Sequence, residues 1–152
     1  MKISSKGEYS LRALITLGEN AGKVMTVAEI SALTKVPSPY LEKILIQLKQ
    51  LGYITSKRGF GGGYRLSQNP KNICIGEVIR KIEGPLAPMG CVSVTSYEPC
   101  SLESSCSLKP LWGLVRDTVA HVLENITLED LVKNKVTEKE DLLNGLWNNQ
   151  RK

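Results

Sequence analysis

The stretch SPYLEKILIQLKQLGYITSKRGFGGGYRLS, residues 38–67, decides the fold of this chain. Its first half has apolar residues at the i, i+3, i+4, i+7 spacing of one helix face: Leu41, Ile44, Leu45 and Leu48. Ser38 can cap this helix, with Pro39 at the first helical position, where the missing N–H of proline has no cost. We therefore expect a helix that runs to Gly52, packs by one face and leaves the other face free.

The second half of this stretch predicts a β-hairpin. One short strand pattern begins at Tyr53, a turn dense in glycine follows, and a second strand pattern ends at Ser67. Gly61, Gly62 and Gly63 suit the turn because glycine tolerates positive φ. The turn lacks the lysine and hydroxyl of a phosphate-binding P-loop, so we exclude a nucleotide site there.

Two helices are expected upstream. Residues 8–18 are rich in helix formers and have an apolar face, and Thr26 with Glu29 three residues later forms a capping box that starts a second helix at Val27. Helix, helix, turn, helix and hairpin is the order of elements in a winged helix-turn-helix domain. The alternative is a three-helix bundle that supports some other function.

Two more helices are expected downstream, with a short one after them. Residues 75–83 predict a helix that a Gly-Pro pair ends, and residues 110–126 predict a long helix. The long helix has an apolar stripe made of Leu111, Leu114, Val115, Thr118, Val119, Val122, Leu123 and Ile126. Because this stripe lies beyond a small core, we expect it to pack on a second copy of the chain. Thr127 can cap the short last helix.

The sequence thus predicts a mainly α fold in four parts. These are a winged helix-turn-helix domain with a β-hairpin wing in residues 1–84, a cysteine-bearing loop in 85–108, a long dimerisation helix with a short following helix in 109–136, and a C-terminal tail in 137–152. The tail is expected to be partly helical and mobile at its end.

Composition narrows the function. The 152 residues include 20 Lys and Arg against 15 Asp and Glu, a net charge of +5 that favours a polyanionic partner. No stretch approaches the roughly 18 apolar residues of a membrane span, so we expect a cytoplasmic protein without membrane contact. Paired carboxylates in a motif, a nucleophile elbow and a Cys/His pair in register are all missing, so we do not expect an enzyme.

The expected DNA-binding residues lie on the free face of the third helix and on the wing. Glu42 can accept a hydrogen bond from a cytosine amino group, Lys43 can donate to guanine or phosphate, and the basic wing can enter a minor groove. The complete predicted set is Ser38, Pro39, Tyr40, Glu42, Lys43, Lys57, Arg58, Gly61, Gly62 and Arg65.

Three cysteines predict a second site. Cys91, Cys100 and Cys106 have the spacing C-x8-C-x5-C in a loop-like stretch, and an odd number of thiols cannot all pair in disulfides. Zinc sites usually contain CxxC pairs, which this stretch lacks, so an iron–sulfur cluster is favoured over zinc. Reversible thiol oxidation without a metal is the alternative. Cys74 lies in an apolar segment and is expected to be a small buried hydrophobe.

Four segments together resemble the Rrf2 family of bacterial winged-helix regulators: MKISSKGEYSLRAL at the start, SPYLEKILIQLKQLGYI, the wing SKRGFGGGYRLS, and IGEVIRKIEGP. The resemblance extends from Met1 to about Asn134. It implies a homodimer that binds pseudo-palindromic double-stranded DNA operators, with the long helix crossing between subunits. It also implies that Glu42 contacts bases and that Arg58 is the wing arginine.

In cluster-bearing members of the family, three loop cysteines hold a two-iron or four-iron centre, and these positions match Cys91, Cys100 and Cys106. Two features differ from the family pattern. The first cysteine spacing is eight residues where five is expected, and Lys109 stands where the iron–sulfur cluster regulator has a histidine. Some relatives add an acidic ligand from the first helix of the other subunit, which matches Glu8. The alternative for Glu8 is an ordinary exposed glutamate, stabilised by the helix dipole.

From the residues and the resemblance we expect a DNA-binding transcriptional regulator whose operator affinity is controlled by an iron–sulfur cluster, either 2Fe–2S or 4Fe–4S. The signal would be cluster supply, redox state, oxygen or nitric oxide. The alternative is a cluster-free winged-helix repressor controlled by a protein partner or by thiol oxidation.

Overall fold

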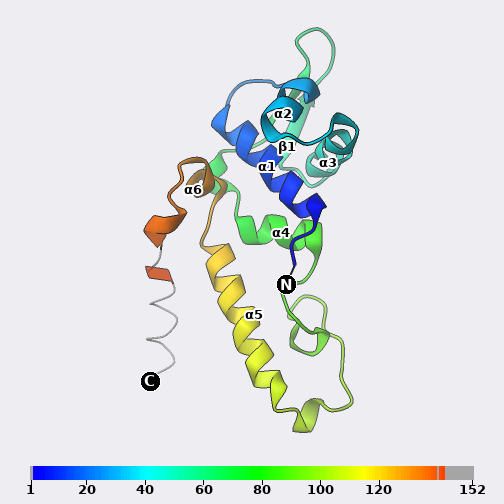
Figure 1. Cartoon of the computed structure of the whole chain (residues 1–152), viewed down its shortest axis with the longest axis vertical. Coiled ribbons are helices and arrows are strands. Elements are labelled where there is room, and N and C mark those ends of the chain that lie inside the picture. The colour runs from blue at the N-terminus through cyan, green and yellow to red at the C-terminus, as the bar shows by residue number, and fades with distance from the viewer. Residues whose placement is uncertain (1, 140, 143–152) are drawn as a thin grey trace.

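A computed structural model gives the structure of residues 2–139, 141 and 142. The helices and strands are α1 (Ser5–Glu19), α2 (Val27–Thr34), α3 (Ser38–Gln50), β1 (Ile54–Lys57), β2 (Gly63–Leu66), α4 (Ile75–Glu83), α5 (Leu108–Glu124) and α6 (Leu128–Val132). Figure 1 shows α1 to α3 and the hairpin at one end of the molecule, α4 and α6 below them, and α5 extending away beside a long loop. The predicted mainly α, winged helix-turn-helix fold is confirmed.

Side-chain caps set the starts of the first two helices. α1 begins at Ser5, earlier than the sequence predicted, because the Ser4 hydroxyl caps it by accepting from the Gly7 amide at 3.2 Å. The same hydroxyl donates to Glu83 Oε1 at 2.7 Å, which holds the start of α1 against the end of α4. The capping box of α2 is confirmed, since Thr26 Oγ1 accepts from the Glu29 amide and the Glu29 carboxylate accepts from the Thr26 amide.

The third helix packs as predicted but starts differently. Its buried residues are Leu41, Ile44, Leu45 and Leu48. The prediction that Ser38 caps the helix is wrong: Pro37 is the N-cap, and its carbonyl accepts from the Tyr40 and Leu41 amides at 3.0 and 2.9 Å, so Ser38 is the first helical residue. The helix ends at Gln50, before Gly52, where the backbone turns to a φ of 82°.

The hairpin forms the predicted wing. β1 and β2 pair antiparallel, with Ile54 opposite Leu66. Tyr64 also exchanges two backbone hydrogen bonds with Met25, at 2.8 and 2.7 Å, which joins the wing to the start of α2. Gly63 is required at this junction, because a Cβ there would lie 2.2 Å from the Met25 carbonyl oxygen and its φ is 151°.

The second half of the chain returns to the same core. Backbone hydrogen bonds pair the Ile75 amide with the Ile126 carbonyl at 2.9 Å and the Leu128 amide with the Ile73 carbonyl at 2.8 Å. α5 ends at Glu124, so Ile126 is not part of a helical stripe as predicted but is buried in the core of the N-terminal domain. Leu123 packs against the same core. Only the earlier part of the predicted stripe is therefore available to a second copy.

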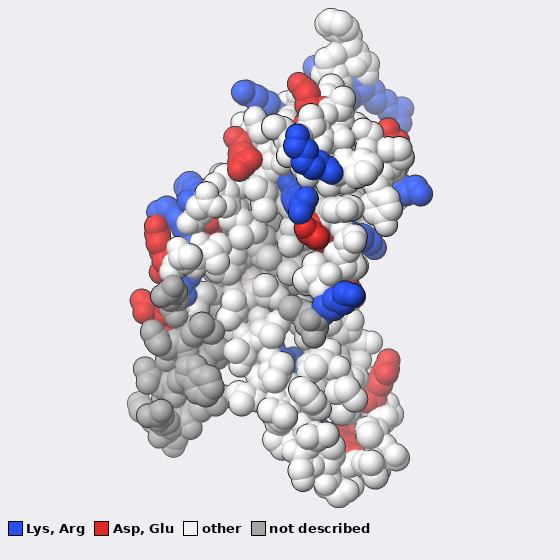
Figure 2. All heavy atoms as spheres, in the orientation of Figure 1, with Lys and Arg blue, Asp and Glu red and all other residues white. Residues whose placement is uncertain are grey.

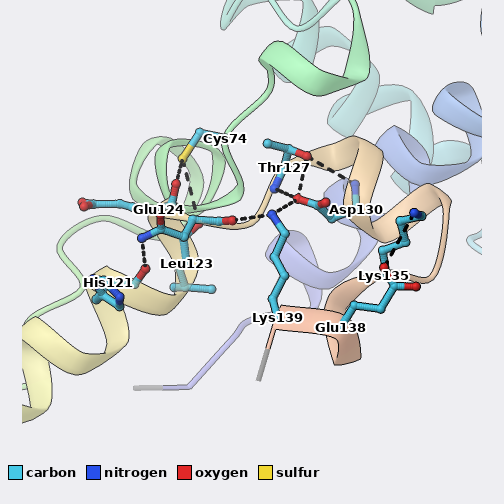
Figure 3. A network of polar contacts seen from close by, with 10 residues as sticks. Cys74, His121, Leu123, Glu124, Thr127, Asp130, Lys135, Glu138 and Lys139 are labelled. Atoms are coloured by element: carbon cyan, nitrogen blue, oxygen red, sulfur yellow. Dashed lines mark hydrogen bonds and ion pairs between the residues drawn. The ribbon is translucent and has the colours of Figure 1, made fainter. Parts of the chain in front are cut away.

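Polar contacts at the junction of α4, α5 and α6 fix the long helix in place (Figure 3). Thr127 caps α6 as predicted, and its amide and hydroxyl donate to Asp130 Oδ2 at 2.8 and 2.7 Å. Lys139 Nζ donates to the same oxygen at 2.6 Å. Although partial burial would by itself raise the pKa of Asp130, these hydrogen bonds lower the pKa to about 2.

Cys74, predicted to be buried, is half-exposed and donates weakly to the Glu124 carbonyl at 3.5 Å.

A single 3₁₀ turn, Val136–Lys139, follows α6. Most of the predicted C-terminal tail, residues 140 and 143–152, lies outside the described residues. Within residues 2–139, 141 and 142, no helix is long and apolar enough to span a membrane.

Candidate DNA-binding surface and cysteine loop

The free face of α3 carries polar and apolar side chains together. Glu42 and Lys43 are exposed, and Tyr40 and Ile46 are about half exposed although both are large and apolar. No hydrogen bond or ion pair joins the Glu42 carboxylate to another side chain or backbone group in the described part of the chain. A carboxylate left free on an exposed helix face can accept hydrogen bonds from a ligand.

The wing extends the same surface with positive charge. Lys57, Arg58 and Arg65 are all exposed, and Figure 2 shows basic side chains grouped at the wing end of the molecule. Lys49 Nζ on α3 donates to Ser56 Oγ on β1 at 2.6 Å, which fixes the wing relative to the helix. The structure thus places all ten sequence-predicted DNA-binding residues on α3 or the wing.

One basic residue near this surface was not predicted. Lys6, in the first turns of α1, lines a shallow pocket of about 170 Å³ together with Tyr40 and Lys43. The Tyr40 ring also packs edge-on against Tyr9 of α1, with 5.9 Å between ring centroids. No sequence spacing links Lys6 to α3, so only the packing of α1 on α3 shows that it adjoins this surface.

The cysteine loop connects α4 to α5. Cys91 lies in a 3₁₀ turn (Gly90–Val92), Cys106 follows another (Glu103–Ser105), and Cys100 lies between them. Cys91 and Cys106 are half-buried and Cys100 is exposed, and all three thiols are free. Among residues 2–139, 141 and 142, the structure does not bring three or more His, Cys, Asp or Glu side chains close enough together to hold a metal ion.

A small polar network holds this loop. Tyr97 Oη donates to Glu103 Oε2 at 2.6 Å, and Lys109 Nζ forms an ion pair with Glu103 Oε1. The hydrogen bond from Lys109 lowers the pKa of Glu103, and the same bond raises the pKa of Lys109. Lys109 is therefore a charged partner of Glu103 and has no lone pair for a metal.

A pocket of about 430 Å³ lies beside the first cysteine. Its lining includes Cys91, Tyr97 and Glu103 from the loop and Lys109 and Arg116 from α5. Arg116 also donates to the Val92 carbonyl at 2.5 Å, so α5 holds the turn that carries Cys91. The loop thus has one half-buried thiol at a pocket and a second, Cys100, in solvent.

Glu8, the predicted acidic ligand, lies in the first turn of α1. Its carboxylate forms an ion pair with Arg12, one turn later, at 2.5 Å, and both side chains are about half exposed. Ser4 and Glu83 hold this end of α1 against the end of α4, the helix that the cysteine loop follows.

The outer half of α5 has an exposed apolar face. It consists of Leu108, Leu111, Leu114 and Val115. In Figure 2 this half of the molecule, formed by α5 and the loop, shows few charged side chains on the face in view.

A helix-turn-helix with a basic wing and an exposed third helix defines a winged-helix DNA-binding protein. The chain belongs to the Rrf2 family, whose model, described as an iron-dependent transcriptional regulator, matches residues 3–134. The HTH-type transcriptional regulator NsrR of Bacillus subtilis (strain 168) is 37% identical over 136 residues, covering 89% of this chain and 92% of that protein. The HTH-type transcriptional regulator CymR of the same strain is 36% identical over 141 residues, covering 92% and 96%.

Two solved structures are similar to this chain over most of its length. The structure of CymR, described as the global cysteine regulator of B. subtilis, matches with a TM-score of 0.74 and 33% identity, covering 88% of this chain and 98% of that one. The structure of T. potens IscR matches with a TM-score of 0.69 and 29% identity, covering 89% and 88%. The protein is therefore an Rrf2-family transcriptional regulator that binds DNA.

Proposed function

We propose that this protein is a homodimeric regulator whose affinity for a pseudo-palindromic operator depends on an iron–sulfur cluster. Cys91, Cys100 and Cys106 would hold the cluster, and Glu8 of the other subunit would complete it. The observation that carries the proposal is the position of the three free thiols, which lie on the one loop that joins the DNA-binding domain to the exposed part of α5.

The chemistry of the donor set fits the group. Thiolates are the ligands of iron–sulfur clusters, and an oxygen ligand such as a carboxylate suits a labile, sensing site. When bound, the cluster would supply a redox- and gas-sensitive centre. The loop itself must rearrange to gather its three thiols, because no group of three ligating side chains is formed among the described residues, and binding and folding of the loop are then coupled.

Contacts of the loop and its neighbours connect this rearrangement to the DNA-binding domain. Arg116 and Val92 connect α5 to the turn of Cys91, and the loop follows α4, whose last residue Glu83 accepts from Ser4 at the start of α1. A rearrangement of the loop would therefore act on α5 directly and on the DNA-binding domain through α4. In a dimer this would alter the distance between the two recognition helices, which must match about 34 Å of DNA.

The test compares wild type with five single variants, Cys91→Ala, Cys100→Ala, Cys106→Ala, Glu8→Ala and Cys74→Ala, after anaerobic purification. Iron and sulfide content, visible absorbance and operator affinity are measured for each. Each loop-cysteine variant should lose iron and change affinity, Glu8→Ala should fold yet lose its iron faster, and the Cys74 control should keep both. A colourless, iron-free wild type refutes the cluster. Iron loss without any change in affinity refutes the sensing role.

A second function is favoured by the likeness to CymR, a protein described as a cysteine regulator. In this case the protein would be a cluster-free repressor controlled by a partner protein or by oxidation of its thiols. Cys100 is the exposed thiol and would be the first to react. Operator affinity that falls on peroxide treatment of iron-free protein, and returns with thiol reductant, would support this alternative.

A further inference from the structure

The end of the wing carries a fully exposed aromatic ring. Phe60 is the only phenylalanine of the chain, and its relative exposure is 106%. The other exposed large apolar side chains of the described residues lie on α2, α3 or α5, in the cysteine loop, or in the turn after α6. Phe60 instead lies at the far end of a hairpin that projects beyond the helices (Figure 1).

The turn is built to expose this one side chain. The Gly62 amide donates to the Gly59 carbonyl at 2.9 Å, which makes Phe60 the second residue of a four-residue turn. Gly61 has a φ of 68°, as the third position of a type II turn requires. A Cβ on Gly62 would lie 2.5 Å from the Lys57 carbonyl oxygen, so the turn folds tightly on itself. The result is a narrow end with glycine on both sides of a single ring.

Positively charged side chains flank the turn that carries the Phe60 ring, but the end of the turn itself is uncharged. Exposed Lys57, Arg58 and Arg65 flank the turn, and the end of the hairpin at the top of Figure 2 is free of charged side chains. A DNA minor groove has the complementary arrangement, with phosphates along both edges and base edges at its floor. The groove is about 6 Å wide, so a turn made mostly of glycine fits where a bulkier hairpin would not.

We propose that Phe60 inserts into the minor groove as a wedge at a base step, partly unstacks it and bends the duplex. Apolar wedges of this kind act by opening a step, and pyrimidine–purine steps open most easily. The wing would then favour operators that have a flexible step at the position of Phe60, while the flanking cations hold phosphates without regard to sequence. This inference rests on the proposed operator binding.

The test uses the full chain and a duplex that the wild-type protein selects from a random-sequence pool. Dyes at the two ends of the duplex report its bend by energy transfer, and a 2-aminopurine at the candidate step reports unstacking. Phe60→Ala should bind about 10- to 100-fold more weakly and lose the bend and the 2-aminopurine signal. Phe60→Trp should retain them. Because the ring is fully exposed in the free protein, both variants should unfold at the wild-type temperature.

Val136→Ala, which shortens an exposed apolar side chain outside the wing, is the matched control and should bind and bend as wild type does. The wedge is refuted if Phe60→Ala binds and bends DNA like wild type while Lys57→Ala weakens binding, and in that case DNA binding by the wing still stands. If the wild type selects no duplex at all, the proposed function and the wedge fail together.

Discussion

Glu42 is the residue on which sequence recognition should depend most. Its carboxylate is exposed on α3 and has no partner among the described residues. Near DNA a carboxylate is repelled by phosphates, so it is tolerated only where it accepts a hydrogen bond, as from a cytosine amino group. Glu42→Ala should therefore reduce discrimination at a cytosine position by about 1–3 kcal/mol, whereas Lys57→Ala should weaken all sequences alike. Competition binding against single-base operator variants measures both, and equal losses on operator and random DNA would remove Glu42 from the base-contacting set.

Asp130 stabilises the junction of α5 and α6 through its charge. Its pKa, lowered to about 2 from an ordinary value of 3.8, means that the native state favours the carboxylate. This contribution is fully present above about pH 4 and is lost as the pH falls toward 2. Asp130→Asn should lower the free energy of unfolding by about 1 kcal/mol at neutral pH, and the difference should shrink below pH 4.

Urea unfolding at several pH values measures the difference in the free energy of unfolding between Asp130→Asn and wild type. Glu138→Gln is the control, because it removes a carboxylate from an exposed pair with Lys135 in the same segment, with 3.6 Å between the charged atoms. Such a pair contributes little, so this variant should stay within a few tenths of a kcal/mol of wild type. If Glu138→Gln lowered the free energy of unfolding as much as Asp130→Asn does, the stabilisation would come from negative charge anywhere in this segment and not from the hydrogen bonds of Asp130 at the helix cap.

At the scale of elements, a glycine sets the distance between α4 and α5. A Cβ on Gly76 would lie 3.1 Å from the backbone at Leu123 and Glu124, where neither helix can yield easily. Gly76→Ala should therefore lower the unfolding temperature although alanine is the better helix former. A Cβ on Gly113, within α5, would meet no described atom within 4 Å apart from its chain neighbours and the backbone of its own helix, so Gly113→Ala should raise stability by about 0.5–1 kcal/mol. If Gly76→Ala and Gly113→Ala both raised stability by the same amount, α4 and α5 would not be closely packed at Gly76.

The elements themselves were largely predictable because their signals are local. The capping boxes of α2 and α6, the buried face of α3 and the glycine turn of the wing all depend on residues a few positions apart. The cap at Ser38 was mispredicted because two neighbouring prolines compete with it, and Pro37 already supplies a suitable φ of −56°. The burial of Ile126 was missed because it depends on strand-like pairing with Ile75, fifty-one residues earlier in the chain.

The same contrast between local signals and long-range contacts applies to the candidate sites. The positions of the ten candidate DNA-binding residues on α3 and the wing were predictable, since these elements are contiguous in sequence and their exposed residues follow from periodicity. That these residues contact DNA stays a prediction. The loop was predictable in its cysteines but not in its contacts. The pairing of Glu103 with Lys109 and Tyr97, and the hold of Arg116 on Val92, join positions whose approach no spacing rule specifies.

At the scale of the whole molecule, the two halves differ in the partner they suit. The DNA-binding half presents cations and a free carboxylate, whereas the outer half of α5 presents leucine and valine side chains to solvent. The cysteine loop joins them along the chain: it follows α4, and Arg116 of α5 donates to its Val92 carbonyl. In the proposed dimer, a signal at the loop would act on DNA by changing the spacing of the two DNA-binding domains.

The proposed control of DNA binding by a cluster acts through a dimer. Leu114 is 38% exposed on the outer face of α5, and a dimer would bury it. Leu114→Glu would place a carboxylate without a partner in that interface, at a cost of several kcal/mol, so the chain should sediment as a folded monomer. The monomer would contact a single half-site and should bind a two-half-site operator at least about 100-fold more weakly. Val136→Glu, which adds the same charge at a similarly exposed residue outside α5, should leave the dimer intact. An intact Leu114→Glu dimer would place the interface elsewhere, and coupling of the loop to DNA would then need a route other than α5.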